Sequence, residues 1–178
     1  KGLYLAAAFA IAMTNFTNCS DKEAAGYIGQ SDIAVEDGKM TPEVMLSLGR
    51  LSDPQLSPDG KTILYGVSYT SVPDNRSCRN LFLVNADGTC RRQLTREGSS
   101  ISCARWAEDG RSIMYIQKGQ LLKATVRGLG GNSPKLVKKT VISDIPAGIS
   151  EFKLSPDGSR IMFVSTVKGA VSTPADSD

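Results

Sequence analysis

One short pattern occurs three times along the chain and constrains the fold more than any other feature. Leu-Ser-Pro-Asp-Gly, followed by an apolar alternating run, occupies residues 56–65 and returns at 154–163, with a looser copy at 105–115. The aspartates of the pattern, Asp59, Asp109 and Asp157, are separated by 50 and 48 residues. A fixed period in this range is typical of a protein built from structural repeats.

The pattern has a local physical cause in each copy. Proline sets φ for the first central position of a tight turn, and aspartate accepts hydrogen bonds from the backbone that follows it. Glycine then takes the left-handed conformation that closes a type I turn with a bulge. Each copy therefore predicts a β-hairpin. The three aspartates could instead be imagined as a repeated metal or ligand ring, but the turn already accounts for them, so we interpret them as turn residues.

The repeats predict an all-β fold, an incomplete β-propeller of about two and a half four-stranded blades. The propeller is expected over residues 51–178, with blades at about 51–97 and 98–140 and an incomplete third blade at 147–178. The expected strands are 51–56, 62–68, 80–85 and 91–95, then 101–106, 112–117, 120–126 and 134–138, then 149–154 and 160–165. Because a closed ring needs about four to eight blades, we expect this sequence to be the N-terminal piece of a longer protein.

A short helix is expected before the blades, over residues 41–50. Thr41 is a suitable N-cap and is followed by Pro42, which fits the first helical position, while Gly49 is expected to end the helix. Its apolar side chains should pack on the blades; they are Val44, Met45 and Leu48.

The first 18 residues are expected to be a signal peptide. Lys1 provides a positive start, and the apolar run at 3–13 is too short for a membrane span of ~20 residues. Cys19 follows directly, and this arrangement resembles the cleavage and lipidation site of bacterial lipoproteins, above all the relaxed form in Bacteroidetes surface lipoproteins. Lipidation of Cys19 is therefore expected; the alternative is a plain signal peptide with an incidental cysteine.

The predicted location is the periplasm or the outer-membrane surface of a Gram-negative bacterium. Residues 19–40 are polar and aperiodic, which favours a tether between a lipid anchor and the helix. The lipid on Cys19 is then the expected means of membrane attachment.

Composition excludes several classes of function. The net charge is only +3 and aromatic residues make up 6%, so the sequence shows no concentrated basic face and no nucleic acid is expected as a partner. The sequence has no histidine, which removes His-based zinc sites and Ser-His-Asp or Cys-His catalysis from within it. Its four cysteines show no C-x-x-C spacing, so neither a metal nor another cofactor is expected.

The cysteines after the tether leave their pairing open. Cys78 and Cys90 lie at opposite ends of the expected strand 80–85, which is too long for bridged Cα atoms within about 7 Å, so that pair is disfavoured. Pairing that involves Cys103 is not decided by the sequence.

Polar residues on an expected long loop at 73–79 are the candidate site residues. Asn75, Arg76 and Arg79 are proposed to contact a substrate entrance or a partner domain, because function concentrates on such loops; a solvated loop is the alternative. Arg91 and Arg92 are expected to be solvated charges that discourage pairing at the blade edge. Trp106, the only tryptophan, is expected in the core between blades.

Three segments together resemble a known family. They are Met40–Arg50, Leu56–Lys61 and Asn80–Gly88. The sequence from about Met40 onward resembles prolyl-oligopeptidase-type serine peptidases, above all the dipeptidyl-peptidase V and acylaminoacyl-peptidase branch. In that family an N-terminal propeller caps a C-terminal α/β-hydrolase domain, which carries the catalytic Ser, Asp and His and whose access the propeller restricts.

The resemblance implies a substrate-gating propeller fragment of an exported serine peptidase. Its implied partners are a peptide substrate and a C-terminal α/β-hydrolase domain outside this sequence. No catalytic residue can be carried over, because the sequence has no histidine and no G-x-S-x-G motif. The alternative is a non-catalytic TolB-like propeller lipoprotein that binds proteins or glycans at the envelope, since such propellers also carry the Leu-Ser-Pro-Asp-Gly hairpin.

Overall fold

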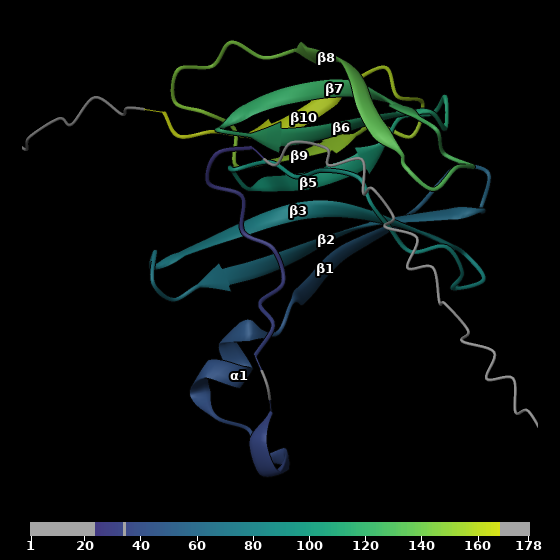
Figure 1. The fold of residues 1–178 in the computed structure, drawn as a ribbon. Helices are drawn as coiled ribbons and strands as arrows, with labels where there is room; N and C mark the ends of the chain where they lie inside the picture. The colour runs from purple at the N-terminus through teal and green to yellow at the C-terminus, as the bar shows by residue number, and fades with distance from the viewer. Residues whose placement is uncertain (1–23, 34, 168–178) are drawn as a thin grey trace, which may run out of the picture.

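The structure is a computed structural model, and it describes residues 24–33 and 35–167. The expected signal peptide, Cys19 and the end of the expected third blade lie outside the described residues. A 3-10 turn η1 (Glu36–Gly38) and the helix α1 (Pro42–Ser47) precede the strands. All strand pairs in the described part are antiparallel, and they form three sheets (Figure 1).

Each sheet follows the order of the chain, as expected for propeller blades. The first, blade one, consists of β1 (Arg50–Leu56), β2 (Thr62–Ser71), β3 (Arg76–Asn85) and β4 (Arg92–Gln93). The second, blade two, consists of β5 (Ile101–Trp106), β6 (Ser112–Gln117), β7 (Gln120–Arg127) and β8 (Lys135–Val141). The third, blade three, pairs β9 (Glu151–Leu154) with β10 (Ile161–Val164). The expected all-β fold with two four-stranded blades and part of a third is confirmed.

The repeated aspartates are turn residues, as expected. Asp59, Asp109 and Asp157 accept hydrogen bonds from the backbone N–H two residues ahead, at 3.1, 2.8 and 3.2 Å. The glycine after each one has a positive φ of 71°, 60° and 63°. The hydroxyls of Ser155 and Ser159 also donate to Asp157, and these bonds lower the pKa of its carboxyl to about 2.

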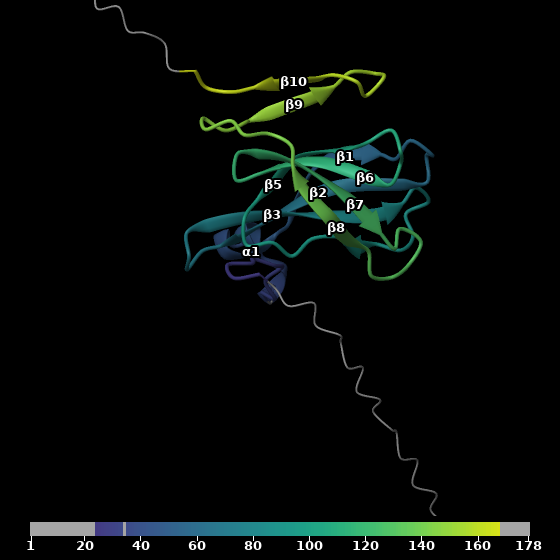
Figure 2. The ribbon, with the colours of Figure 1, turned by 90° about the horizontal axis from the view of Figure 1, so that it is seen from above.

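The blades stack because their strands are apolar on both faces. Successive side chains of a strand point to opposite faces, so Leu64 of β2 packs toward blade two and its neighbour Tyr65 packs away from it. In β6, Ile113 and Tyr115 pack toward blade one, whereas Met114 and Ile116 pack toward blade three. In Figure 2, β9 and β10 lie to one side of the strands of the other two blades. Trp106 lies in the core between the first two blades, as expected.

The helix forms where it was expected, but its packing differs. The Thr41 side chain accepts a hydrogen bond from the backbone N–H of Val44, which confirms it as the N-cap. Val44 is buried, whereas Met45 and Leu48 are each 52% exposed, so the expectation that all three pack on the blades is wrong for two of them. The reason is that the helix ends at Ser47 and presents little more than one turn to blade one, on the side away from blade two (Figure 1).

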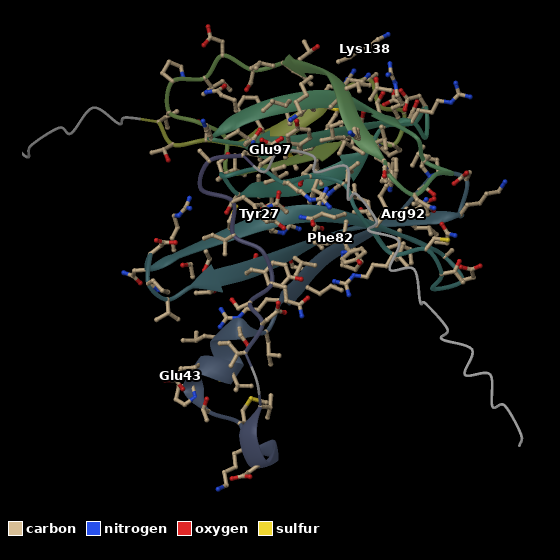
Figure 3. All side chains as sticks on the ribbon, in the orientation of Figure 1. Tyr27, Glu43, Phe82, Arg92, Glu97 and Lys138 are labelled. Atoms are coloured by element: carbon tan, nitrogen blue, oxygen red, sulfur yellow. The ribbon has the colours of Figure 1, made fainter. Side chains whose placement is uncertain are left out.

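The described part of the expected tether is attached to blade one instead of hanging free. Ala24 N–H donates to the carbonyl of Arg96 at 3.2 Å, and the Gln93 amide donates to the Tyr27 hydroxyl at 2.9 Å. Ile28 is buried in the cluster on the outer face of blade one. Tyr27 is labelled beside the blades in Figure 3. The apolar residues of this segment follow no helical or strand period, which is why the sequence pattern did not reveal this contact.

The expected long loop at 73–79 is a hairpin, so that prediction is wrong. β2 continues to Ser71 and β3 begins at Arg76, and these two residues pair directly. The hydroxyls of Thr70 and Ser77, the next pair, lie 2.8 Å apart. Threonine and aromatic residues favour strands, and Pro73 with the residues after it supplies a tight turn, so the hairpin extends beyond the expected strand ends.

Blade three exposes an apolar edge. Ile161, Met162, Phe163 and Val164 of β10 are between 38% and 67% exposed. Within the described residues β10 pairs with β9 alone. An apolar strand with one free edge is a template for pairing with other chains.

We expect this chain, produced by itself, to self-associate through β10. The combined changes Met162→Lys and Phe163→Lys should shift the chain toward monomer, because lysines on an edge strand oppose pairing. Val72→Lys, which places a lysine on the exposed β2–β3 turn, should not. Light scattering after size-exclusion chromatography measures the mass of each variant. A monodisperse monomer of the unchanged chain would contradict this expectation.

Candidate functional site at the inner strands

The first strands of the blades, β1 and β5, share an irregularity at the same repeat position. Their pairing with β2 and β6 shifts register between Ser52 and Gln55 and between Ser102 and Arg105. The residues inside the shifts, Asp53 and Cys103, have φ values of 53° and 50°, which are uncommon for residues other than glycine. Such bulges bend a strand and re-aim its side chains.

The bulge in β1 places Asp53 between two arginines from different blades. Its carboxylate lies 2.7 Å from Nη1 of Arg105 in blade two and 3.8 Å from Nη2 of Arg79 in blade one. The three side chains are partly buried, with exposed fractions of 26%, 25% and 12% respectively. Because partial burial weakens screening by water, this ion pair is stronger than one on the open surface.

Arg79 crosses the face of blade one from β3 to the inner strand. Its Nε donates to the Ser52 hydroxyl at 3.0 Å, and its Nη1 donates to the Ile101 carbonyl of blade two at 2.7 Å. Gly66 of β2 lies under the guanidinium, and a Cβ at this position would overlap it. Burial lowers the pKa of Arg79 and the charge of Asp53 opposes that shift, but a guanidinium remains protonated in proteins. Arg79 therefore keeps its charge and joins the inner strands of two blades.

The three residues selected from the sequence do not form one site. Arg79 belongs to the cluster just described. Arg76 donates to the carbonyls of Gly26 at 2.6 Å and Gly98 at 2.9 Å, so it holds the N-terminal segment against the β4–β5 link. Asn75 is exposed at the tip of the β2–β3 hairpin, with a φ of 45°. Contact of these residues with a substrate entrance or a partner domain stays a prediction.

Two ion-pair residues of the inner strands and one buried arginine were not predicted from the sequence. Asp53 and Arg105 were overlooked, although the 50-residue offset between Asp59 and Asp109 places them on equivalent strands and could have paired them. Arg92 was expected to be solvated and this is wrong: it is buried and donates to the carbonyls of Leu129 and Gly131. It thereby holds the β7–β8 link of blade two against blade one; Figure 3 labels it.

Within the described residues, the cysteines and acidic residues form no further cluster. Cys78, Cys90 and Cys103 are free thiols. Among the residues that the structure describes, no three His, Cys, Asp or Glu side chains gather closely enough to hold a metal ion. No helix within 24–33 and 35–167 is long and apolar enough to span a membrane.

The fold and the inner-strand cluster define a propeller built of four-stranded antiparallel blades. Residues 34–174 match the family model described as the lipoprotein LpqB beta-propeller domain. The chain belongs to this family.

Comparison with curated proteins adds relatives among the peptidases. The chain is 32% identical over 135 residues to dipeptidyl-peptidase 5 of Porphyromonas endodontalis, a match that covers 75% of the chain and 19% of that protein. It is 34% identical over 150 residues to dipeptidyl-peptidase 5 of Porphyromonas gingivalis, covering 82% and 21%. The chain thus spans about a fifth of the length of these relatives.

A solved structure has the same fold. The acylaminoacyl peptidase of Pyrococcus horikoshii matches 68% of this chain and 18% of its own, with a TM-score of 0.52 and 17% sequence identity. Together with the two dipeptidyl-peptidase relatives, this match confirms the resemblance to the N-terminal propeller of prolyl-oligopeptidase-type peptidases.

We expect Gly66 and Arg79 to be energetically coupled. Gly66→Ala should destabilise the fold by ~1–3 kcal/mol because the new Cβ displaces the Arg79 guanidinium from its partners. In a chain that already carries Arg79→Ala, Gly66→Ala should reduce the free energy of unfolding by at least ~1 kcal/mol less, because residues in contact do not contribute additively to stability. Urea unfolding of the four variants measures the coupling.

Gly130→Ala is the matched control, because a Cβ there meets no atom within 4 Å. Its cost should be the same with and without Arg79. Additive costs for Gly66→Ala and Arg79→Ala would show that Arg79 does not depend on the space that Gly66 leaves.

Proposed function

We propose that this chain is the propeller portion of an exported serine peptidase and gates the access of peptides to a catalytic domain that lies outside it. The observation that carries this proposal is the pair of dipeptidyl-peptidase relatives, which match at 32% and 34% identity over most of this chain. In each case the chain covers only about a fifth of the relative.

The proposal divides the chemistry between two parts of the protein. A Ser-His-Asp triad needs a histidine, and this chain has none, so the nucleophile and its base belong to the proposed α/β-hydrolase domain. The propeller then acts on the substrate by exclusion, because only chains that pass its ring reach the nucleophile. Peptide bonds are not broken by any residue of this chain.

The topology suggests where that domain would attach. Four antiparallel strands return the chain to the end of the blade from which it started, so β1 begins at the same end as the β2–β3 turn and the β4–β5 link. A domain that continues the chain after complete blades emerges at this end. Asn75, at the tip of the β2–β3 hairpin, is then placed to contact it.

Covalent labelling tests this function. We expect a fluorophosphonate to label the complete product of the gene on a serine outside residues 1–178, and to leave this chain unlabelled when it is produced alone. The complete product should hydrolyse dipeptide reporters and this chain should not. A labelled serine within this chain, or a complete product without a reactive serine, would overturn the proposal.

A non-catalytic envelope lipoprotein is the second candidate. The description of the matched family, which names a lipoprotein, favours it. Under this alternative the ring binds proteins or glycans, and the gene encodes further blades and then ends. Under the first, the blades are followed by a domain with G-x-S-x-G and then Asp and His in that order. The downstream coding sequence separates the two.

Lipidation of Cys19 is proposed under both candidates. The sequence position of Cys19 after an apolar run supports it, as does the family description. We expect Cys19→Ser to move the protein from the membrane fraction to the soluble fraction of cells. Cys90→Ser, which changes an exposed thiol of blade one, should leave the partition unchanged. Equal partition of the Cys19 variant and the unchanged protein would contradict lipidation.

A further inference from the structure

A cavity of about 370 Å³ opens at the inner strands and is lined by the same two repeat positions of all three blades and by Pro58. Residues 55, 105 and 153 are equivalent in the repeat, and so are residues 56, 106 and 154, because the offsets of 50 and 48 residues that relate the turn aspartates also relate them. The first position contributes a polar row and the second an apolar row. The two rows are Gln55, Arg105 and Lys153, and Leu56, Trp106 and Leu154.

The polar row carries positive charge without an acidic side chain in the cavity lining. Arg105 and Lys153 are its two cations, and no described Asp or Glu lines this cavity. The carboxylate that pairs with Arg105, that of Asp53, is shared with Arg79. The described lining of the cavity therefore carries two cationic side chains and no carboxylate.

Arg105 is held in place and keeps donors for a ligand. Its hydrogen bonds to described residues, to Asp53 at 2.7 Å and to the Ala104 carbonyl at 2.8 Å, both leave from Nη1. Nη2 and Nε therefore keep N–H groups in a fixed orientation, and a guanidinium binds a carboxylate with such paired donors. Lys153 is exposed and adds a mobile cation on the neighbouring blade.

The apolar row makes the cavity suitable for a peptide and not only for a small anion. Leu56 is 59% exposed, so its side chain is available for contact. The indole N–H of Trp106 donates to the carbonyl of Gln55 at 3.3 Å, which fixes the ring and leaves only apolar contact to offer. A peptide with an aliphatic or aromatic side chain next to a carboxylate would cover both Leu56 and Trp106.

We propose that this cavity binds an acidic peptide segment, with the carboxylate of a glutamate or aspartate at Arg105 and Lys153 and a neighbouring apolar side chain against Leu56 and Leu154. The substrate class that follows, peptides with acidic residues, rests on the proposed function. The binding site itself does not, because its geometry is independent of hydrolysis.

Blocked peptides test the binding apart from any cleavage. Fluorescence anisotropy measures the binding of two labelled peptides to the complete natural protein. Both peptides are acetylated at the amino end and amidated at the carboxyl end. One contains Glu-Leu-Glu, and the other contains Gln-Leu-Gln at the same place. The acidic peptide should bind about tenfold more tightly, the size of one charge-assisted hydrogen bond. The preference should fall as salt rises.

Two variants locate the preference. Lys153→Gln, an exposed change that should leave the fold intact, is expected to reduce the preference for the acidic peptide by about threefold or more. Arg105→Gln should abolish it, with thermal unfolding monitored because the ion pair to Asp53 is also lost. Arg127→Gln removes an exposed arginine outside the cavity and should leave the preference unchanged.

Equal binding of the two peptides, or a preference that survives Lys153→Gln and Arg105→Gln, overturns the inference. The outcome is distinct from a failure of the proposed function. A protein that binds the acidic peptide through Arg105 and Lys153 but hydrolyses no reporter retains this site and loses the peptidase. A protein that cleaves reporters but binds both peptides equally keeps the peptidase and loses this site.

Discussion

Everything in this structure depends on stacking sheets face to face. A blade that is apolar on both faces, as blade two is through Ile113 on one side and Met114 on the other, can be stable only between two neighbours. Burial of each such side chain contributes about 1.5–3 kcal/mol. Stacking also brings the first strands of successive blades together, and this is why repeat positions far apart in sequence line one cavity.

Polar residues make the stack rigid where the chain passes from one blade to the next. Asn80 is almost fully buried. Its side-chain amide oxygen Oδ1 accepts hydrogen bonds from the Thr95 hydroxyl at 2.9 Å and from the Glu97 backbone N–H at 2.8 Å. A buried amide with satisfied partners fixes the β4–β5 link in one conformation. Arg76 and Arg79 bind carbonyls of the same region, so blade two starts at a defined place relative to blade one.

The sequence predicts local features well and long-range partners poorly. The turns at Asp59, Asp109 and Asp157 and the cap at Thr41 could be predicted because a few adjacent residues determine them. The burial of Arg92 could not, because its partners are carbonyls some 37 and 39 residues away in blade two. The packing of Ile28 on blade one could not be predicted either, because the residues that it contacts are also far away in sequence. In the candidate site only Arg79 was named in advance, and it was expected on a loop.

The repeats separate the positions that build the blades from those that give the centre its chemistry. The Asp-Gly turn is present in all three copies because the backbone requires it. The polar inner-strand position instead changes from Gln55 to Arg105 to Lys153, although all three side chains line the same cavity. The backbone hydrogen bonds of the strands do not require this variation, because these side chains take no part in them. The charge at the inner strands is therefore not determined by the fold of the blades.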